Sequence, residues 1–370
     1  MVSSQKSEQE VLDRRFMAAA IRFSRKHAGL TSTNPSVGTL IVRNGAIVGR
    51  GVTAIGGRPH AEPQALAEAG ELARGATAYV TLEPCAHHGR TPPCANALVT
   101  AGITRVVGAA SDPDSRVSGK GYAILREAGI EVVERVMADE AAEQLAPYLA
   151  RSVKKRPEVI LKLAVSKDGM IGRLGSGQVP ITGPISRRQV HMTRAEVDAI
   201  IVGIRTAIAD DPELTVRLPG LEARSPARIV LDRGLRLPLT AKMVATANAV
   251  PVFVTACPDA DAKKRDALEA AGVKFLAAEV YDGRIALPEL LEDLASQGMS
   301  SVLLEGGAAT AKEFLEDGLV DRIMLFEGKL EIGAQGIASP VRRDHMPGGF
   351  TLLREAQFGD DLYSEWLRVE

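Results

Sequence analysis

Short apolar runs alternate with stretches of helical periodicity along the first 110 residues. The runs, which are rich in Val, Leu and Ile, lie at 37–42, 78–82 and 105–108. Continuous apolar segments of this length are typical of buried strands. The stretches with helical spacing lie at 14–27, 61–72 and 93–100. We assign the stripe of Phe16, Ala20 and Phe23 to core packing. This order of elements predicts an α/β domain.

A basic segment that ends in proline, residues 151–157, precedes a second alternating series. We interpret this segment as a solvated linker rather than a binding patch. The strand candidates that follow lie at 159–165, 199–202, 228–231, 250–255, 301–304 and 322–326. The pattern predicts one α/β domain over 1–150, with residues 1–10 disordered, and a second over 158–370.

Composition limits the classes of function. The chain has 370 residues, 45% of them hydrophobic, which is enough for two cores. A net charge of -1 and only 4% aromatic residues argue against a nucleic-acid partner. No apolar run is long enough for a membrane span, and the first ten residues lack a signal-peptide core. Three cysteines provide no disulfide framework, so we expect a cytoplasmic protein.

Candidate chemistry is concentrated at two short motifs in the first half. Pro59-His60-Ala61-Glu62 and the segment from Cys85 to Cys94 supply one imidazole, two thiolates and a spare carboxylate. These are the residues of a catalytic zinc site with an open fourth position. In the zinc deaminases, a Glu two residues after the His ligand transfers the proton. The motifs therefore predict hydrolytic deamination, with His60, Cys85 and Cys94 on the metal and Glu62 catalytic.

The spacing of the two cysteines leaves an alternative open. Eight residues separate Cys85 from Cys94, where the general deaminase signature has two. His87 and His88 lie in this loop, so either could complete a closed structural zinc site, and two unrelated buried thiols are a further possibility. A catalytic site is favoured because Glu62 begins an apolar-faced helix beside His60. Cys94 also falls near a helix start, which favours a thiolate.

The second half carries less specific signals. The predicted strand at 301–304 runs into Glu305-Gly306-Gly307 and then a helix over 308–316, where backbone N–H groups can face a phosphate. A plain tight turn would have the same pattern. Arg194 and Arg217 flank a strand and the pair Asp210-Asp211, and arginine forks suit phosphate, although each could equally be a surface residue.

The motifs together resemble one family, the bifunctional riboflavin-biosynthesis deaminase/reductases. The deaminase-like segments are 33–38, 59–62, 81–94, 112–113 and 117–121. The reductase-like segments are 161–164, 181–183, 194–195, 210–212, 214–217 and 305–307. The resemblance extends from about residue 13 to nearly the end of the chain. The eight-residue gap before Cys94 is this family's form of the motif.

The resemblance implies a cytidine-deaminase-like three-layer domain followed by a dihydrofolate-reductase-like domain. It also implies two reactions on a phosphoribosylated pyrimidine. Zinc-dependent deamination of 2,5-diamino-6-(5-phosphoribosylamino)pyrimidin-4(3H)-one would be followed by NADPH-dependent reduction of the ribosyl group to ribityl. The implied cofactor positions are Ala164, Pro180, Thr206, Asp210, Arg233, Gly307, Ala308, Ala309 and Thr310. The implied substrate positions are Asn34, Lys162, Gln178, Arg194, Leu214, Arg217 and Glu305.

Two positions depart from the family pattern. Pro180 stands where the family usually has a cofactor-contacting Trp, and the single tryptophan of this chain is Trp366. Arg233 replaces a residue that is more often small, so it could pair with the 2′-phosphate of NADPH or form a surface salt bridge. Proline offers ring contact without indole stacking, so we expect weaker cofactor binding unless a neighbour compensates.

Two other classes of function compete with this interpretation. A nucleobase or tRNA deaminase would share the zinc motif, but this chain lacks the basic patch that a polyanion requires. A non-enzymatic zinc module with an idle second domain is the other alternative. The sequence leaves open whether the protein forms a homo-oligomer.

Overall fold

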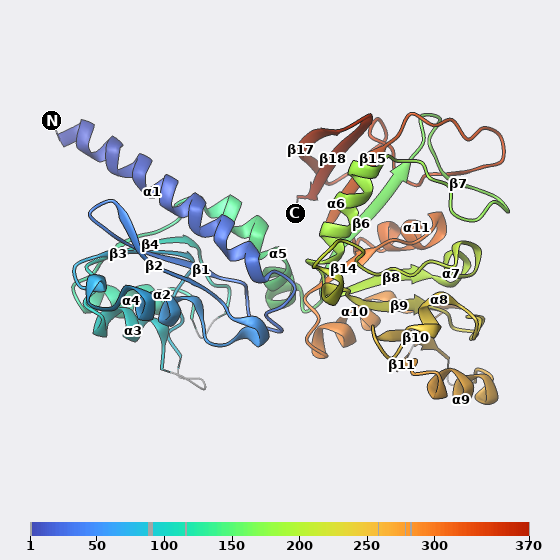
Figure 1. The fold of residues 1–370 in the computed structure, drawn as a ribbon, viewed down its shortest axis with the longest axis horizontal. Helices are drawn as coiled ribbons and strands as arrows, with labels where there is room; N and C mark the ends of the chain where they lie inside the picture. Colours follow the sequence, from blue (N-terminus) through green and yellow to red (C-terminus); the bar gives the residue numbers. More distant parts are fainter. Residues whose placement is uncertain are drawn as a thin grey trace. The chain divides into compact units, whose positions relative to one another are not determined.

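The computed structural model describes residues 2–87, 92–114, 117–257, 259–277, 279–281 and 283–369, with side chains from residue 8 onward. The chain divides into two compact units, Met1–Lys155 and Arg156–Glu370, and Figure 1 shows the elements of both. Within the ranges just given, every helix is too short or too polar to cross a bilayer.

A mixed sheet lies at the centre of the first unit, and its described strands have the order β2-β1-β3-β4-β5. They are β1 (Gly38–Arg43), β2 (Ala46–Val52), β3 (Thr77–Leu82), β4 (Arg105–Ala110) and β5 (Glu131–Val133). β1 is antiparallel to β2 and β3, whereas β3, β4 and β5 are mutually parallel. The strands predicted at 37–42, 78–82 and 105–108 are confirmed as β1, β3 and β4.

Helices cover both faces of this sheet. They are α1 (Val2–Ser24), α2 (Ala61–Ala69), α3 (Cys94–Thr100), α4 (Lys120–Glu127) and α5 (Ala138–Lys154). α1 and α5 pack on one face, while α2, α3 and α4 pack together on the other, which gives three layers (Figure 1). The predicted helices at 61–72 and 93–100 are thus confirmed, apart from a short 3₁₀ turn that replaces the end of the first.

β2 is missing from the sequence prediction, and its composition explains why. Gly49, Arg50 and Gly51 interrupt its apolar run, although Asn44-Gly45 before it is a strong hairpin signal. Both turn residues have positive φ, 52° and 75°, as a type I′ turn requires. Because Gly49 and Gly51 lack side chains, the backbone of α2 packs very closely against β2. A Cβ at Gly51 would lie only 1.9 Å from the carbonyl oxygen of Ala61 at the start of that helix.

The predicted limits of this unit remain predictions. α1 begins at Val2, within the segment 1–10 that we expected to be disordered. Gln, Lys and Glu in its first turns are good helix formers, and the helix packs through Met17 and Ala20. The proposed linker 151–157 is also helical as far as Lys154. Its basic residues suit a helix C-terminus, where they oppose the macrodipole, and Pro157 follows just after the helix ends.

A larger sheet forms the second unit, where the described strands have the order β11-β10-β9-β8-β14-β6-β15-β18-β17. They are β6 (Glu158–Val165), β8 (Ala199–Gly203), β9 (Ala227–Leu231), β10 (Val252–Ala256), β11 (Lys274–Ala277), β14 (Ser301–Leu304), β15 (Arg322–Glu327), β17 (Phe350–Phe358) and β18 (Asp361–Arg368). All neighbours are parallel except at β15-β18 and β18-β17. All six predicted strands are confirmed. The β17-β18 hairpin escapes prediction because β17 is mostly exposed and lacks an apolar run.

Alternate residues of the parallel strands face two separate cores. Val159, Leu161 and Leu163 of β6 point to one core, whereas Ile160 belongs to the other. The helices are α6 (Pro184–Arg194), α7 (Ile204–Asp210), α8 (Lys242–Ala245), α9 (Ala262–Ala270), α10 (Leu287–Ser296) and α11 (Ala308–Glu316). α10 and α11 cover the first core, and α6 to α9 contribute to the second. Trp366, on β18, packs against the first core.

Two small strand pairs complete the unit. β7 (Met170–Arg173) pairs with β16 (Gly336–Ala338), and β12 (Val280–Tyr281) pairs with β13 (Arg284–Ile285). Both pairs lie outside the large sheet, and residues from each of them line the cavity of this unit.

A buried ion pair fastens α1 to the first sheet. Asp13, which is 3% exposed, accepts hydrogen bonds from both Nη atoms of Arg105 at 2.8 and 2.7 Å and from the Tyr79 hydroxyl at 2.8 Å. Burial opposes ionisation of Asp13, but the hydrogen bonds from Arg105, Gln9 and Tyr79 outweigh it and lower the pKa of the carboxyl group. The folded state therefore favours the ionised carboxylate.

We expect Asp13→Asn to lower the free energy of unfolding by about 2 kcal/mol at neutral pH, because it removes the buried charge that pairs with half-buried Arg105. Since the folded pKa is depressed, this stabilisation is present above the ordinary Asp pKa of about 4 and is lost as the pH falls through the folded value. Urea unfolding followed by circular dichroism measures both effects. The exposed partner of Arg14, Glu140, provides the control Glu140→Gln, with little expected effect. Equal losses in both variants would contradict this role.

Candidate functional site

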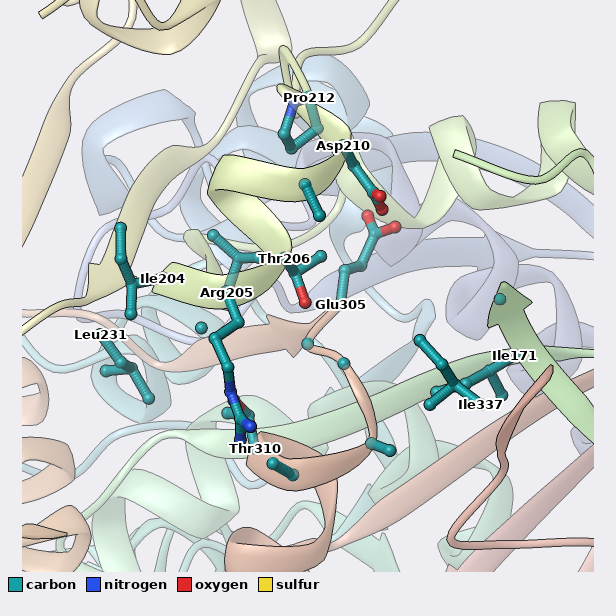
Figure 2. Close-up of a pocket in the computed structure, with 18 of the residues that line it drawn as sticks. Ile171, Ile204, Arg205, Thr206, Asp210, Pro212, Leu231, Glu305, Thr310 and Ile337 are labelled. Atoms are coloured by element: carbon teal, nitrogen blue, oxygen red, sulfur yellow. The ribbon is translucent and has the colours of Figure 1, made fainter. Parts of the chain in front are cut away.

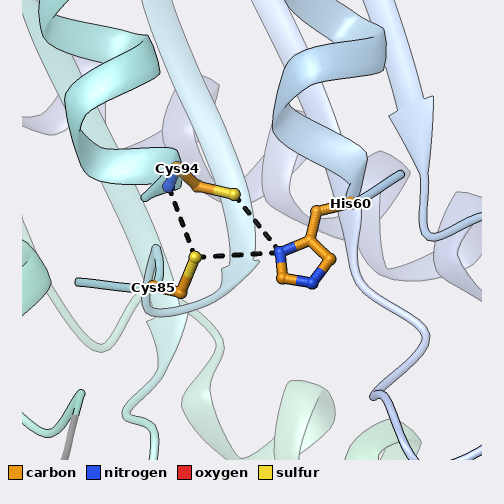
Figure 3. A group of neighbouring side chains, drawn as sticks. All are labelled: His60, Cys85 and Cys94. Atoms are coloured by element: carbon orange, nitrogen blue, oxygen red, sulfur yellow. Dashed lines mark hydrogen bonds between the residues drawn. The ribbon is translucent and has the colours of Figure 1, made fainter. Parts of the chain in front are cut away.

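Three residues from separate segments of the first unit converge on one point. His60 directly precedes α2, Cys85 follows β3, and Cys94 is the first residue of α3. Nδ1 of His60 lies 3.3 Å from Sγ of Cys94 and 3.7 Å from Sγ of Cys85 (Figure 3). A tetrahedral zinc ion with ordinary Zn–N and Zn–S bonds separates its N and S ligands by about 3.6 Å. The three predicted ligands are therefore already spaced for zinc.

The pKa shifts of the two thiols are also consistent with a site for a divalent cation. The hydrogen bond with Cys94 and that with His60 lower the pKa of Cys85 to about 4, although burial opposes this. The same Cys85 interaction, together with burial, raises the pKa of Cys94. The lowered pKa of Cys85 favours its thiolate, whereas the raised pKa of Cys94 favours its thiol. A divalent cation removes the repulsion between two thiolates, so both could bind it.

The backbone supports the same arrangement. The N–H of Cys94, at the start of α3, donates to Sγ of Cys85 at 3.3 Å, so an unpaired helix-terminal donor stabilises the sulfur. The Ala95 N–H also donates to the carbonyl of Cys85 at 3.3 Å. The long gap between the two cysteines is therefore closed at its base by hydrogen bonds.

A fourth protein ligand is absent from this group among the described residues. Only His60, Cys85 and Cys94 bring ligand atoms within 4.8 Å of one another. His87 is described and does not join them, although its Nδ1 is buried and lacks a hydrogen-bond partner in the described structure. His88, the other candidate for a closed site, lies outside the described residues. The donor set fits a catalytic zinc with an open position.

Glu62 lies in the first turn of α2, two residues after His60, and is only 4% exposed. Burial raises the pKa of its carboxyl group, and the Cys85 charge raises it further, while His60 and Cys94 act in the opposite direction. A carboxyl group that is buried beside the ligands and readily protonated is suited to carrying a proton.

Asn34, the predicted base-edge contact, lies on a loop next to the segment that leads to His60. Its side-chain amide packs over Gly57, where a Cβ would lie 2.3 Å from Nδ2. Gly57 has φ 89°, a left-handed conformation that also favours glycine. The loop that carries Asn34 therefore packs against Gly57, in the chain segment that precedes His60.

The second unit contains a large cavity of about 1180 Å³ (Figure 2). Its walls come from β6 and β7, from the segments after β8, β9 and β14, and from the β12-β13 hairpin. Pockets for single drug-sized ligands span roughly 300 to 1,000 Å³, so this one can hold a dinucleotide or two smaller ligands. The predicted residues that line it are Lys162, Ala164, Gln178, Arg194, Thr206, Asp210, Leu214, Arg233, Glu305, Gly307, Ala308, Ala309 and Thr310.

Three of these residues form a buried charge cluster. Arg194 donates from Nε and Nη2 to the two oxygens of Glu305, at 2.6 and 3.1 Å, and Lys162 Nζ lies 3.7 Å from the same carboxylate. Burial alone would raise the pKa of Glu305, but Arg194 and Lys162 reverse this and lower it to about 2. Burial also lowers the pKa of Lys162. Arg194 is thus engaged by protein partners, which include the carbonyl of Thr215 at 3.1 Å.

Two glycine turns form a narrow cradle beside this cluster. A Cβ at Gly307 would meet the Thr206 hydroxyl at 2.6 Å, and one at Gly203 would meet the Thr310 hydroxyl at 2.3 Å. The starts of α7 and α11 therefore lie close together, with two hydroxyl groups between them (Figure 2). Backbone N–H groups and hydroxyls in a tight turn suit the phosphates of a dinucleotide.

A buried acceptor in the same cavity also lacks a partner. Asp232, 1% exposed at the end of β9, lines the cavity and uses Oδ2 to accept the Leu237 N–H at 2.8 Å. Its Oδ1 is buried and has no hydrogen-bond partner among the described residues. A buried polar atom without a partner is unusual and indicates a missing donor, such as a ligand hydroxyl or amino group. The cavity therefore fits a cofactor such as NADPH.

Three residues that were expected to contact the cofactor or substrate have other surroundings in the structure. Neither Pro180 nor Arg217 is among the described residues that line the cavity, although Val179 and Ile181 on either side of Pro180 do line it. Arg217 is half exposed and pairs with Glu213 at 2.9 Å. Arg233 lines the cavity, but its Nη1 donates to the Gly283 carbonyl in the loop of the β12-β13 hairpin.

Other cavity residues were not predicted. Arg205 and Arg236 are exposed arginines that follow β8 and β9, and both line the cavity. An isolated surface arginine gives no signal in a sequence. Only the position of each one directly after a buried parallel strand could have identified it.

Comparison with known proteins gives matches to both units. Residues 10–110 match the cytidine and deoxycytidylate deaminase zinc-binding region, and residues 157–357 match the RibD C-terminal domain. The riboflavin biosynthesis protein RibD of Aquifex aeolicus is 41% identical over 335 residues, which cover 89% of this chain and 92% of that protein. The corresponding protein of Escherichia coli K12 is 37% identical, with 94% of each chain covered.

A solved structure is similar over nearly the whole chain. It is a diaminohydroxyphosphoribosylaminopyrimidine deaminase/5-amino-6-(5-phosphoribosylamino)uracil reductase from Thermotoga maritima, with a TM-score of 0.85 and 31% identity. The similarity covers 98% of this chain and 100% of that one. The fold class expected from the sequence is thereby confirmed in both units.

We expect Cys85→Ser to weaken zinc binding by more than about 100-fold, because even supporting residues around a metal contribute 10- to 100-fold. Metal analysis of the purified protein after dialysis measures this loss. Cys257→Ser is the matched control, since Cys257 is outside the three-ligand group and should leave the zinc content unchanged. Retention of wild-type zinc by Cys85→Ser would overturn the ligand assignment.

Proposed function

The chain belongs to the RibD family of bifunctional riboflavin-biosynthesis enzymes, and from this membership we propose which residues carry its two reactions. It is a zinc-dependent pyrimidine deaminase and an NADPH-dependent reductase. The observation that carries the assignment of residues is the open three-ligand group beside buried Glu62. The substrate is 2,5-diamino-6-(5-phosphoribosylamino)pyrimidin-4(3H)-one, followed by its deaminated product.

His60, Cys85 and Cys94 hold the zinc in the deaminase unit. When bound, the zinc would supply an acidified water molecule as the nucleophile near neutral pH. Glu62 would accept a proton at its carboxylate and donate it to the amino group that leaves the pyrimidine ring as ammonia. The raised pKa of Glu62 helps it to hold the proton between these two steps. Asn34 holds the edge of the base.

The charge cluster of the reductase unit orients the sugar. NADPH supplies the hydride that converts the ribosyl group to ribityl. Glu305, kept ionised by Arg194, accepts hydrogen bonds from sugar hydroxyls, and Lys162 donates one or supplies a proton from Nζ. Gln178 and Leu214 line the substrate part of the cavity. Ala164, Thr206, Asp210 and the segment Gly307, Ala308, Ala309 and Thr310 contact the cofactor.

Several sequence predictions remain proposals. We place the protein in the cytoplasm, and we expect each compact unit to fold as a domain, with the boundary near Arg156. Pro180, just outside the cavity lining, acts on the cofactor through Val179 and Ile181. A homo-oligomer remains a prediction.

We expect Glu62→Gln to retain zinc and to lower the rate of ammonia release by about 10² to 10⁴, because the amide keeps the shape but cannot transfer a proton. Glu68→Gln is the control on the same helix, since Glu68 is exposed and pairs with Arg50. NADPH oxidation with deaminated substrate should be unchanged in both variants. Near-normal ammonia release from Glu62→Gln would assign the proton to another group.

Arg217 is on the same loop as Leu214, which lines the cavity. Its exposed guanidinium pairs with exposed Glu213 and donates a long hydrogen bond to the Thr215 hydroxyl at 3.5 Å. We expect Arg217→Ala to raise KM for the phosphorylated substrate about 10- to 100-fold and to leave KM for NADPH unchanged. Steady-state titrations of each substrate measure this split. An unchanged substrate KM would make Arg217 an ordinary surface residue.

A further inference from the structure

One end of the reductase cavity is strongly basic. Arg205, Arg233, Arg236 and Arg284 all line it. They follow β8 or β9 or lie on β13, so they occupy the side of the cavity away from the Lys162 and Arg194 cluster. The acidic groups that follow the same strands or lie nearby in the lining are Asp210, Asp232 and Glu313, so the four arginines leave positive charge in excess there.

These arginines differ in the protein groups to which their guanidinium groups are hydrogen-bonded. Arg233 is bonded to the Gly283 carbonyl. In contrast, Arg205 and Arg236 have neither an ion pair nor a side-chain hydrogen bond among the described residues. Figure 2 shows the Arg205 side chain extended away from α7. The Thr310 hydroxyl closes the glycine cradle at the start of the same helix. Two exposed guanidinium groups without partners, both facing one cavity, form a binding site for an anion.

The order of strands in the sheet places this anion relative to the reacting groups. Arg236 follows β9, Arg205 follows β8, the Gly306-Gly307 turn follows β14, and Lys162 lies on β6. These four strands are adjacent, in this order. Neighbouring strands are about 4.8 Å apart, so the cavity extends roughly 14 Å from the arginines to Lys162. An elongated ligand can therefore contact the arginines, the glycine cradle and the sugar site together.

We infer that Arg205 and Arg236 bind the 2′-phosphate of the adenosine half of NADPH and so determine the preference for NADPH over NADH. The inference rests on the proposed reductase function and revises the expectation for Arg233, whose guanidinium is already bonded to the hairpin backbone. The free Oδ1 of Asp232 then accepts a hydrogen bond from an adenosine hydroxyl or amino group. The buried carboxylate of Asp232 repels a nearby phosphate, and the two guanidinium groups offset this repulsion.

The test is equilibrium binding to the full-length protein, with NADPH, NADH, adenosine 2′,5′-bisphosphate and 5′-AMP as the probes. The variants are Arg205→Gln, Arg236→Gln and the double variant. Arg188→Gln is the matched control, because Arg188 is exposed on α6 and does not line the cavity. We expect each single variant to raise Kd for NADPH and for adenosine 2′,5′-bisphosphate about 10- to 100-fold. Kd for NADH and for 5′-AMP should stay within a factor of about 2.

The possible outcomes distinguish a failure of this inference from a failure of the proposed reductase function. If both variants lose NADPH and NADH affinity equally, or lose neither, the two arginines do not read the 2′-phosphate. If Arg233→Gln alone produces the selective loss, the phosphate is bound on the hairpin side instead, and the inference is wrong. If the wild-type protein binds neither dinucleotide nor oxidises NADPH with deaminated substrate, the reductase function itself fails.

Discussion

The directions of the strands determine where chemistry can occur in each unit. In the first sheet, β3 and β4 are parallel and β1 runs against β3, so the beginning of β1, the end of β2 and the end of β3 share one edge. Asn34 precedes β1, His60 follows β2, and Cys85 follows β3. The sheet topology therefore brings Asn34 and Cys85, which are 51 positions apart in the sequence, to the same edge of the sheet. The second sheet obeys the same rule at the ends of β8, β9 and β14.

Charge is treated differently in the two halves of the reductase cavity. Glu305, Arg194 and Lys162 largely neutralise one another, so a substrate with hydroxyl groups can bind there without introducing an uncompensated charge. Arg205 and Arg236, which follow β8 and β9, are exposed and have no ion pair within the described structure, which makes their end of the cavity attractive to a phosphate dianion. A single cavity can therefore hold a ligand with hydroxyl groups at one end and a phosphate group at the other.

The zinc site could be predicted from the sequence because its ligands are chemically rare and lie within 35 residues of one another. The reductase site was harder to predict from the sequence. Lys162 and Thr310 line the same cavity only because the strand order of the sheet differs from the order along the chain. Most of the reductase positions that the family resemblance implies line the cavity, and their roles remain proposals. The resemblance could not place Arg205 or Arg236, because exposed arginines have no pattern, nor could periodicity identify α1 before Asp13 or the exposed strand β17. In these segments helix propensity and strand pairing outweigh the apolar signal.

The location of the single tryptophan has a practical consequence. Trp366 lies on β18 of the second unit, and the first unit contains tyrosines but no tryptophan. Its indole N–H donates to Ser364 at 3.0 Å, and the ring packs against the core that α10 and α11 cover. Fluorescence excited selectively at tryptophan therefore reports on the reductase unit alone. The intact protein contains a built-in optical probe for one of its two halves, and no label or truncation is required to observe it.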